Sequence, residues 1–548
     1  LFRVVVFASQ FGGIEHDSGW YLGEAKNLAL RGVYASYTNT VVNDGVGAFP
    51  SIHGRFSVQD ANGYVYFPAG VSVGPGYVIP ESVIIKLFGS GFWQYRAWPL
   101  IGFTAMLALT LFIVYETGGM LGLILFAIWM WFLPQFTTQF AYEAFGEDIA
   151  FGFLLAGFFL LHISTVLKKK KFLALFIAGV FLALSYLTKT LFVISVVGVA
   201  AFIIPDFFRS VRSQKIAFLK RWGLCIAGFL LPILLFQVYE QGYIVSQFGN
   251  SGWHAVTEDN RISFAINGSG IDAMNLHGIT HLDWNFVYKK FLVWVNLGIS
   301  QAVVVWLAFL LLPIGIYTCV EKKYRTFLCS LYIAAFVPFV WYLLFASFGW
   351  ARHIWQGLII AMMLFCICIG SIFLRMHTLK NKLIFLAVGV FGLALILKPH
   401  MFNGNLFFSQ QTIEDWRSIR EVTGLNGFPS NDTFSLSDEK GLVTFFSSHI
   451  TAKDRVYYVG WFLNAEVSPL VDKVFYPLER FVNLGQINPD GGKSYAIFGH
   501  YQQGEWSIES PTYVPEKAAQ LCDMEVYKNP TYMVCTLRQG ISYTNAAY

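Results

Sequence analysis

Glu15 and Asp17 stand two residues apart at the start of a long polar segment. The chain before them, Leu1 to Phe11, is apolar, and further strongly apolar segments follow, so both carboxylates are expected at the edge of a membrane-embedded body. Carboxylates beside hydrocarbon are costly, and by default they indicate a function. Such a pair could supply a general base, line an ion path or belong to an ordinary acidic loop.

A second acidic group, Glu143, Glu147 and Asp148, lies between two apolar segments in a connection that contains no basic residue. Carboxylate oxygens are the ligands that Mg²⁺, Mn²⁺ or Ca²⁺ prefers, so Glu147 and Glu143 are candidate ligands of a divalent cation, which Glu15 could share. The alternative is that these side chains stabilise the N-terminus of a helix.

Basic residues occupy two other short connections between apolar segments, Lys189 in one and Arg352 with His353 in the other. A lysine between two apolar spans must extend to the interface or pair with an acid, and the planar guanidinium of arginine suits phosphate. These residues are candidate phosphate ligands or, alternatively, interface anchors. Arg96, at the entry to another span, is a weaker candidate.

The composition identifies the class of protein. Of 548 residues, 55% are hydrophobic, 18% aromatic and only 13% charged, whereas a soluble domain has about 25% charged residues. We therefore expect an integral membrane protein. The net charge of +5 is small and gives no reason to expect a nucleic-acid partner. The chain has no initiator methionine, and we expect its apolar start to be the end of a first spanning helix.

Ten apolar spans are predicted after this first helix, which gives a polytopic body of about eleven transmembrane helices. They cover approximately 100–115, 117–134, 148–167, 172–188, 190–205, 222–239, 292–317, 326–347, 355–375 and 383–398. Alternate connections hold clusters of basic residues, at 168–171, 209–221, 322–325 and 375–382. Because positive residues remain in the cytoplasm, the opposite connections are predicted outside.

The transmembrane domain is predicted to cover 1–398, with a first outer loop at 15–99 and a second large one at 240–290. The first loop is predicted to hold a helix that buries Leu22, Ala25 and Leu28 and is capped by Asp17 or Ser18. A second apolar stretch, 82–89, is predicted to run along the membrane surface.

The tail, 399–548, alternates turn-rich stretches with strand-like runs, which is typical of a small α/β domain, here predicted outside the membrane. Cys522 and Cys535 lie in this tail and are disulfide candidates if it faces an oxidising compartment. The alternative is two unpaired thiols.

The order of these parts resembles the GT-C glycosyltransferases, membrane enzymes that move a sugar from a polyprenyl-phosphate carrier to an acceptor. The group includes protein O-mannosyltransferases, the aminoarabinose transferase acting on lipid A, arabinosyltransferases and oligosaccharyltransferases. Four segments carry the resemblance, and each motif is loose by itself: Asp17–Tyr34, Phe67–Gly76, Tyr186–Lys189 and Arg455–Trp461.

The resemblance implies a GT-C fold with two membrane-surface helices in the first outer loop, and inverting sugar transfer at the outer face of the plasma or inner membrane. Asp17 would be the general base, with Glu15 and Glu147 as support or metal ligands. Lys189, Arg352 and His353 would hold the phosphate of the donor. The acceptor would be a glycan, a lipid or a protein, and membrane lipids would surround the body.

Two other functions remain open at this level. A transporter or flippase of a lipid-linked sugar could also use acidic and basic residues near the membrane, although no internal repeat is apparent. A GT-C-like protein without activity could serve as a subunit of a membrane assembly, although Glu15 and Asp17 are both present.

Overall fold

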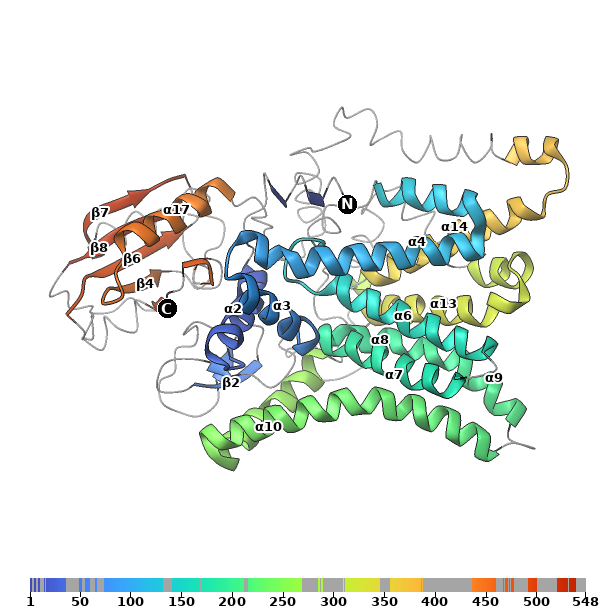
Figure 1. Cartoon of the computed structure of the whole chain (residues 1–548), viewed down its shortest axis with the longest axis horizontal. Helices are drawn as coiled ribbons and strands as arrows, with labels where there is room; N and C mark the ends of the chain where they lie inside the picture. Colours follow the sequence, from blue (N-terminus) through green and yellow to red (C-terminus); the bar gives the residue numbers. More distant parts are fainter. Residues whose placement is uncertain are drawn as a thin grey trace.

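A computed structural model gives the architecture of the protein (Figure 1). It describes residues 1, 4–5, 8–9, 14, 16–35, 49–51, 55–59, 65–66, 73–131, 140–167, 170–210, 215–268, 284–285, 287–288, 309, 311–344, 355–385, 387, 436–459, 467, 469–471, 473, 475–477, 491–499, 520–530 and 532–538.

Seven helical segments in the described part are long and apolar enough to cross a membrane. They are α4 (Phe92–Trp131), α6 (Glu147–Val166), α7 (Lys171–Thr188), the run η2 (Thr190–Phe192), α8 (Val193–Val196), η3 (Val197–Val199) and α9 (Ala200–Ser210), then α10 (Lys215–Gly268), α13 (Lys322–Leu344) and α14 (Trp355–Arg375). The protein is therefore a polytopic helical membrane protein, as the composition predicts. The predicted spans 292–317 and 383–398 lie largely outside the described residues.

Two of these helices differ in extent from the predicted spans. The predicted spans 100–115 and 117–134 correspond, as far as Trp131, to the two helical parts of α4, which begins earlier, at Phe92, and is divided by non-helical backbone at Gly119. Helix α10 continues beyond the predicted span 222–239, with a similar break at Gly249. The part of α4 before residue 100 contains Gln94 and Arg96, and the part of α10 after residue 239 contains charged residues such as Glu240; an apolar window excludes such residues.

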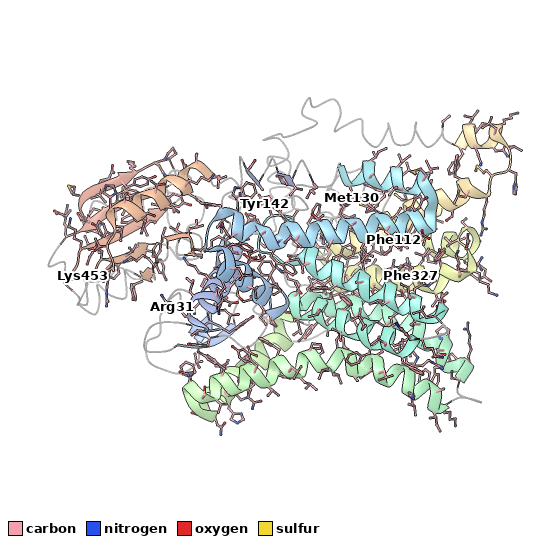
Figure 2. All side chains as sticks on the ribbon, viewed as in Figure 1. Arg31, Phe112, Met130, Tyr142, Phe327 and Lys453 are labelled. Atoms are coloured by element: carbon pink, nitrogen blue, oxygen red, sulfur yellow. A yellow bond between two sulfur atoms is a disulfide. The ribbon has the colours of Figure 1, made fainter. Side chains whose placement is uncertain are left out.

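The core of the helical body forms where α6, α7, α13 and α14 pack together. Large buried side chains there include Phe151, Leu331 and Trp355. Helices α7 and α10 approach each other closely at Gly228, where the absence of a side chain leaves room for the backbone of Phe176. A Cβ atom at this position would collide with the carbonyl oxygen of Phe176. In Figure 2 the labelled Phe112 and Phe327 lie among these long helices.

Two shorter helices, α2 (His16–Arg31) and α3 (Pro75–Phe88), lie at one end of the long helices (Figure 1). The predicted buried face of α2 is confirmed, since Leu22 and Ala25 are buried and Leu28 packs against the same cluster. Helix α2 begins at His16, however, so Asp17 and Ser18 lie in its first turn and not before it.

Helix α3 has one buried and one exposed apolar face. Ile79, Val83 and Leu87 recur every four residues and are 44%, 50% and 69% exposed, whereas Tyr77 and Val78 are buried. A stripe of exposed apolar side chains at helical spacing is expected of a helix that contacts lipid on one side. A small antiparallel sheet, β1 (Phe49–Ser51), β2 (Arg55–Gln59) and β3 (Val65–Tyr66), belongs to the same loop.

The tail contains a five-stranded sheet in the order β5-β4-β6-β8-β7. Its strands are β4 (Arg455–Val459), β5 (Phe475–Pro477), β6 (Ser494–Gly499), β7 (Cys522–Lys528) and β8 (Tyr532–Leu537). Strand β4 pairs in parallel with β5 and β6, and β8 pairs antiparallel with β6 and β7. Helix α17 (Leu436–His449) packs on the sheet through Leu442 and Phe446. This sheet and helix lie next to the end of the long helices where α2 and α3 are found (Figure 1).

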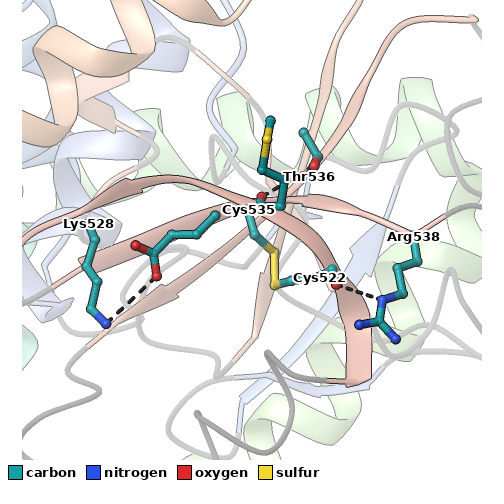
Figure 3. Close-up of a disulfide and its surroundings, with 7 residues drawn as sticks. Cys522, Lys528, Cys535, Thr536 and Arg538 are labelled. Atoms are coloured by element: carbon teal, nitrogen blue, oxygen red, sulfur yellow. Dashed lines mark hydrogen bonds and ion pairs between the residues drawn. A yellow bond between two sulfur atoms is a disulfide. The ribbon is translucent and has the colours of Figure 1, made fainter.

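Within this sheet a disulfide joins Cys522 of β7 to Cys535 of β8, with a Cα–Cα distance of 5.6 Å (Figure 3). The other five cysteines are free thiols. Buried side chains beneath the sheet include Val456, Ile497 and Val534, so the tail has an apolar cluster of its own.

Candidate active site

Lys189 lies at the end of α7, where that helix meets the start of α6. Its Nζ atom forms an ion pair with Glu147 Oε1 at 2.9 Å and donates a hydrogen bond to the carbonyl oxygen of Phe145 at 3.0 Å. The two charged side chains are only 11% and 5% exposed. The lysine between two apolar spans therefore pairs with an acid, and the structure brings together two residues that the sequence singles out.

The turn before α6 places the acidic residues. Gly146 is the N-cap of α6 and has φ +77°, a left-handed conformation that glycine adopts without steric cost. This turn points the chain so that Glu147 and Asp148 form the first turn of α6, where the helix dipole favours negative charge. Glu143, in the turn itself, is 4% exposed, and Asp148 is fully buried.

The first outer loop is attached to this same place by three contacts. The backbone N–H of Ala144 donates to Ser18 Oγ at 2.9 Å, the N–H of Gly74 donates to the Thr188 carbonyl at 3.0 Å, and Val73 forms an antiparallel bridge with Lys189. Ser18 directly follows Asp17, so the first turn of α2 lies beside the turn that carries Glu143. The first turn of α2, which carries Asp17, and the turn that carries the predicted second acidic group therefore belong to one neighbourhood.

Helix α3 adds two buried polar side chains that the sequence reading did not single out, Tyr77 and Glu81. Both are 0% exposed. Burial raises the pKa of Tyr77 well above its usual value, and the negative charges of Glu81, Asp148 and Glu143 raise it further. Burial also raises the pKa of Glu81, which favours its neutral form. Their spacing of four residues on an otherwise apolar face was the available signal.

Arg96 joins the site from α4. Its guanidinium lies 5.4 Å from the ring centre of Tyr142, next to Glu143, and donates to the carbonyl oxygen of Ala8. Figure 2 places Tyr142 near the end of α4 that adjoins α2 and α3. Arg96 is 4% exposed, so this residue, ranked low from the sequence, is a buried cation close to the acidic turn.

Other predicted site residues lie outside the described part of the chain: Glu15, Arg352, His353 and the side chain of Asp17. Among the described residues no group of three carboxylate, histidine or cysteine side chains is arranged to hold a metal ion. Glu147, one of the two predicted ligands, pairs with Lys189. The described residues alone do not fit a metal centre, and we derive no chemical step through one.

Comparison with known proteins shows the fold. No family model matches the sequence, and neither does any curated protein. The crystal structure of ArnT from Cupriavidus metallidurans bound to undecaprenyl phosphate matches with a TM-score of 0.59 at 12% identity, over 100% of this chain and 98% of ArnT.

The apo form of the same ArnT matches with a TM-score of 0.51 at 12% identity, over 97% of this chain and 95% of ArnT. The oligosaccharyltransferase AglB from Archaeoglobus fulgidus, in complex with an inhibitory peptide and a dolichol-phosphate, matches at 11% identity over 99% of this chain and 74% of AglB. Its TM-score of 0.46 is too low to support an argument. Because the ArnT match extends over both chains almost completely, this integral membrane protein has the GT-C fold that the resemblance in its sequence implies.

Proposed function

We propose that this protein is an inverting GT-C glycosyltransferase that moves a sugar from a polyprenyl-phosphate carrier to a glycan, lipid or protein acceptor. The observation that carries the proposal is the joining of the start of α2, the acidic turn before α6 and Lys189 in one neighbourhood. The whole-chain likeness to ArnT, a protein crystallised with undecaprenyl phosphate, supports the same conclusion.

The chemistry requires a base on one side of the sugar and a cation on the other. The acceptor oxygen would attack the anomeric carbon while the bond from that carbon to the carrier phosphate oxygen breaks. Asp17 would take the proton from the acceptor hydroxyl, and the phosphate would leave with the bonding electron pair. A single displacement of this kind inverts the configuration at the anomeric carbon.

Lys189 would stabilise the charge that develops on the departing phosphate, together with Arg352 and His353. In the present arrangement Lys189 is paired with Glu147, so the arriving phosphate would exchange with this carboxylate or share the lysine with it. Glu147 and Glu15 would support the site by setting its local electrostatic potential, to which Glu143 would also contribute.

The reaction would take place on the extracytoplasmic side. Supporting this, the positive-inside rule predicts that the basic connections stay in the cytoplasm, and Lys189 lies at the opposite end of its helix from such a connection. The disulfide in the tail agrees with an oxidising compartment. The tail would contribute to the choice of acceptor.

The test is transfer from a panel of labelled polyprenyl-phosphate sugars by the purified full chain, comparing wild type with Asp17→Asn. We expect Asp17→Asn to abolish transfer in a folded protein. Asp523→Asn, an exposed carboxylate-to-amide change in β7, is the matched control and should retain full activity.

Each other outcome has a defined meaning. Transfer that survives in Asp17→Asn would assign the base elsewhere, with Glu15 and Glu147 examined next by the same carboxylate-to-amide change. A wild-type protein that transfers no sugar from any donor would contradict the proposal. The transport of a lipid-linked sugar, or an inactive subunit, would then be tested in its place.

A further inference from the structure

The tail contacts the backbone immediately before the acidic motif. Glu439, in the first turn of α17, accepts hydrogen bonds from the backbone N–H of Ile14 at both carboxylate oxygens, at 2.9 Å and 3.1 Å. Glu439 is 0% exposed. A buried carboxylate is costly unless it is hydrogen-bonded, and a bond from a backbone N–H to a charged acceptor is among the stronger kinds.

Ile14 is well placed to transmit this contact. It directly precedes Glu15 and stands two residues before the first residue of α2. Its side chain is 3% exposed and packs in one cluster with Trp20 of α2 and with Ala144 of the acidic turn. Ile14 is therefore held by the tail through its backbone N–H and by the apolar cluster beside the site through its side chain.

A second, separate tail contact joins α2 and α4. The carbonyl oxygen of Pro469 accepts hydrogen bonds from Lys26 Nζ of α2 at 2.5 Å and from the hydroxyl of Tyr95 of α4 at 2.6 Å. Leu470 packs against the cluster that contains Ile14. The tail therefore holds the chain at two places, at Ile14 just before α2 and at Lys26 within it, and so defines both the position and the direction of that helix.

We propose that Glu439 is a positioning residue, through which the tail sets the place of Glu15 and Asp17 for sugar transfer. The inference deepens the proposed function and rests on it. Glu439 touches neither donor nor acceptor in this role; it acts through the Ile14 amide. A misplacement of about 1 Å in a reacting group can cost about a hundredfold in rate, so a single anchoring contact can control the turnover.

The experiment compares Glu439→Ala, Glu439→Gln and Ser447→Ala in the full chain. Ser447 is exposed on the same helix and, among the described residues, its hydroxyl bonds only to Val443 within that helix, so its change is the matched control. We expect Glu439→Ala to lower kcat at least about tenfold while KM for the donor changes less than about threefold. Glu439→Gln keeps an acceptor oxygen but loses the charge, so we expect a kcat loss of about two- to fivefold.

Three results would overturn the proposal. One is a wild-type kcat in Glu439→Ala, and another is a change confined to KM. The third is a loss of activity that follows the loss of folded protein and is not rescued in Glu439→Gln, because that pattern describes a purely structural residue. Thermal stability and elution in detergent are measured for all variants to separate these results.

Hydrogen exchange of the Ile14 amide tests the contact without any activity. We expect exchange in the segment 10–20 to become at least about tenfold faster in Glu439→Ala and to stay unchanged in Ser447→Ala. Unchanged exchange in Glu439→Ala would refute the anchoring contact even if the protein is a transferase. Faster exchange in Glu439→Ala, together with a wild type that transfers no sugar, would contradict the proposed function but would still support the contact between Glu439 and Ile14.

Discussion

Lys189 and Glu147 form an ion pair of 2.9 Å that joins the end of α7 to the start of α6. Both side chains are almost buried, so neither charge is compensated by water. Removing one partner of a buried pair is costly, whereas replacing both partners is often nearly neutral. Stability and activity can therefore be separated at this pair.

Lys189→Met should destabilise the protein by about 3 to 5 kcal/mol, because it leaves the Glu147 carboxylate buried without its cation. The double variant Lys189→Met with Glu147→Gln should recover most of that stability but remain inactive, since the departing phosphate loses the charge of Lys189. Thermal unfolding in detergent and sugar transfer measure the two effects. A double variant as unstable as the single one would show that the ion pair is not the cause.

The stability of the first loop should decrease as pH rises. Burial raises the pKa of Glu24, on α2, to about 8, and Tyr34 lies beside both Glu24 and Glu240. Between the usual glutamate pKa of 4.5 and about 8, the folded protein keeps a proton that the unfolded chain releases, so this contribution to stability is full below the lower pKa and is lost as pH rises to the higher one.

The slope from this one group should reach about 1.4 kcal/mol per pH unit. Glu24→Gln mimics the neutral carboxyl and should remove this part of the pH dependence, so the variant should exceed wild type in melting temperature at pH 9 and match it at pH 4.5. Equal pH profiles for the two proteins would contradict the raised pKa.

Two glycines of α10 should respond oppositely to alanine. A Cβ atom at Gly228 would collide with the backbone of Phe176, whereas nothing lies within 4 Å of the corresponding position at Gly223. Gly228→Ala should separate α7 from α10 and lower the melting temperature. Gly223→Ala should be neutral or stabilising by up to about 1 kcal/mol, because alanine favours a helix interior. A similar effect of both changes would argue against the close approach.

Alkylation of the denatured protein should count its thiols. Without reductant five cysteines should react, since Cys522 and Cys535 form a disulfide, and after reduction all seven should react. Cys535→Ser should destabilise the tail by about 2 to 4 kcal/mol, whereas Cys319→Ser, at a free and partly exposed thiol, should not. Seven reactive thiols without reductant would exclude the disulfide.

Local patterns account for what the sequence predicts well. The predicted span 172–188 agrees with α7 (Lys171–Thr188), because its apolar run is bounded by lysines at both ends. The buried face of α2 follows from helical spacing alone. The importance of Lys189 follows from the cost of a charge between apolar spans. Its partner does not follow from the sequence, because the ion pair with Glu147 depends on how α7 and α6 pack together.

Contacts between distant parts of the chain could not be predicted in this way. The sequence predicts Asp17 or Ser18 as the cap of α2, but the hydroxyl oxygen of Ser18 accepts a hydrogen bond from the backbone N–H of Ala144, and this bond depends on how α2 packs on the turn before α6. Glu439 gave no signal because an acidic residue in the first turn of a helix is ordinary there. Its role depends on a partner 425 residues away.

That separation has a consequence for biosynthesis. Chains are made from the N-terminus, so Ile14 and Lys26 leave the ribosome long before Glu439 and Pro469, which are their partners. While the residues between Lys26 and Glu439 are being made, the first loop lacks these hydrogen bonds to the tail. If Glu439 fixes the acidic motif, the newly made protein acquires turnover only after the tail has folded against the first loop, so no sugar is transferred before synthesis has reached the tail.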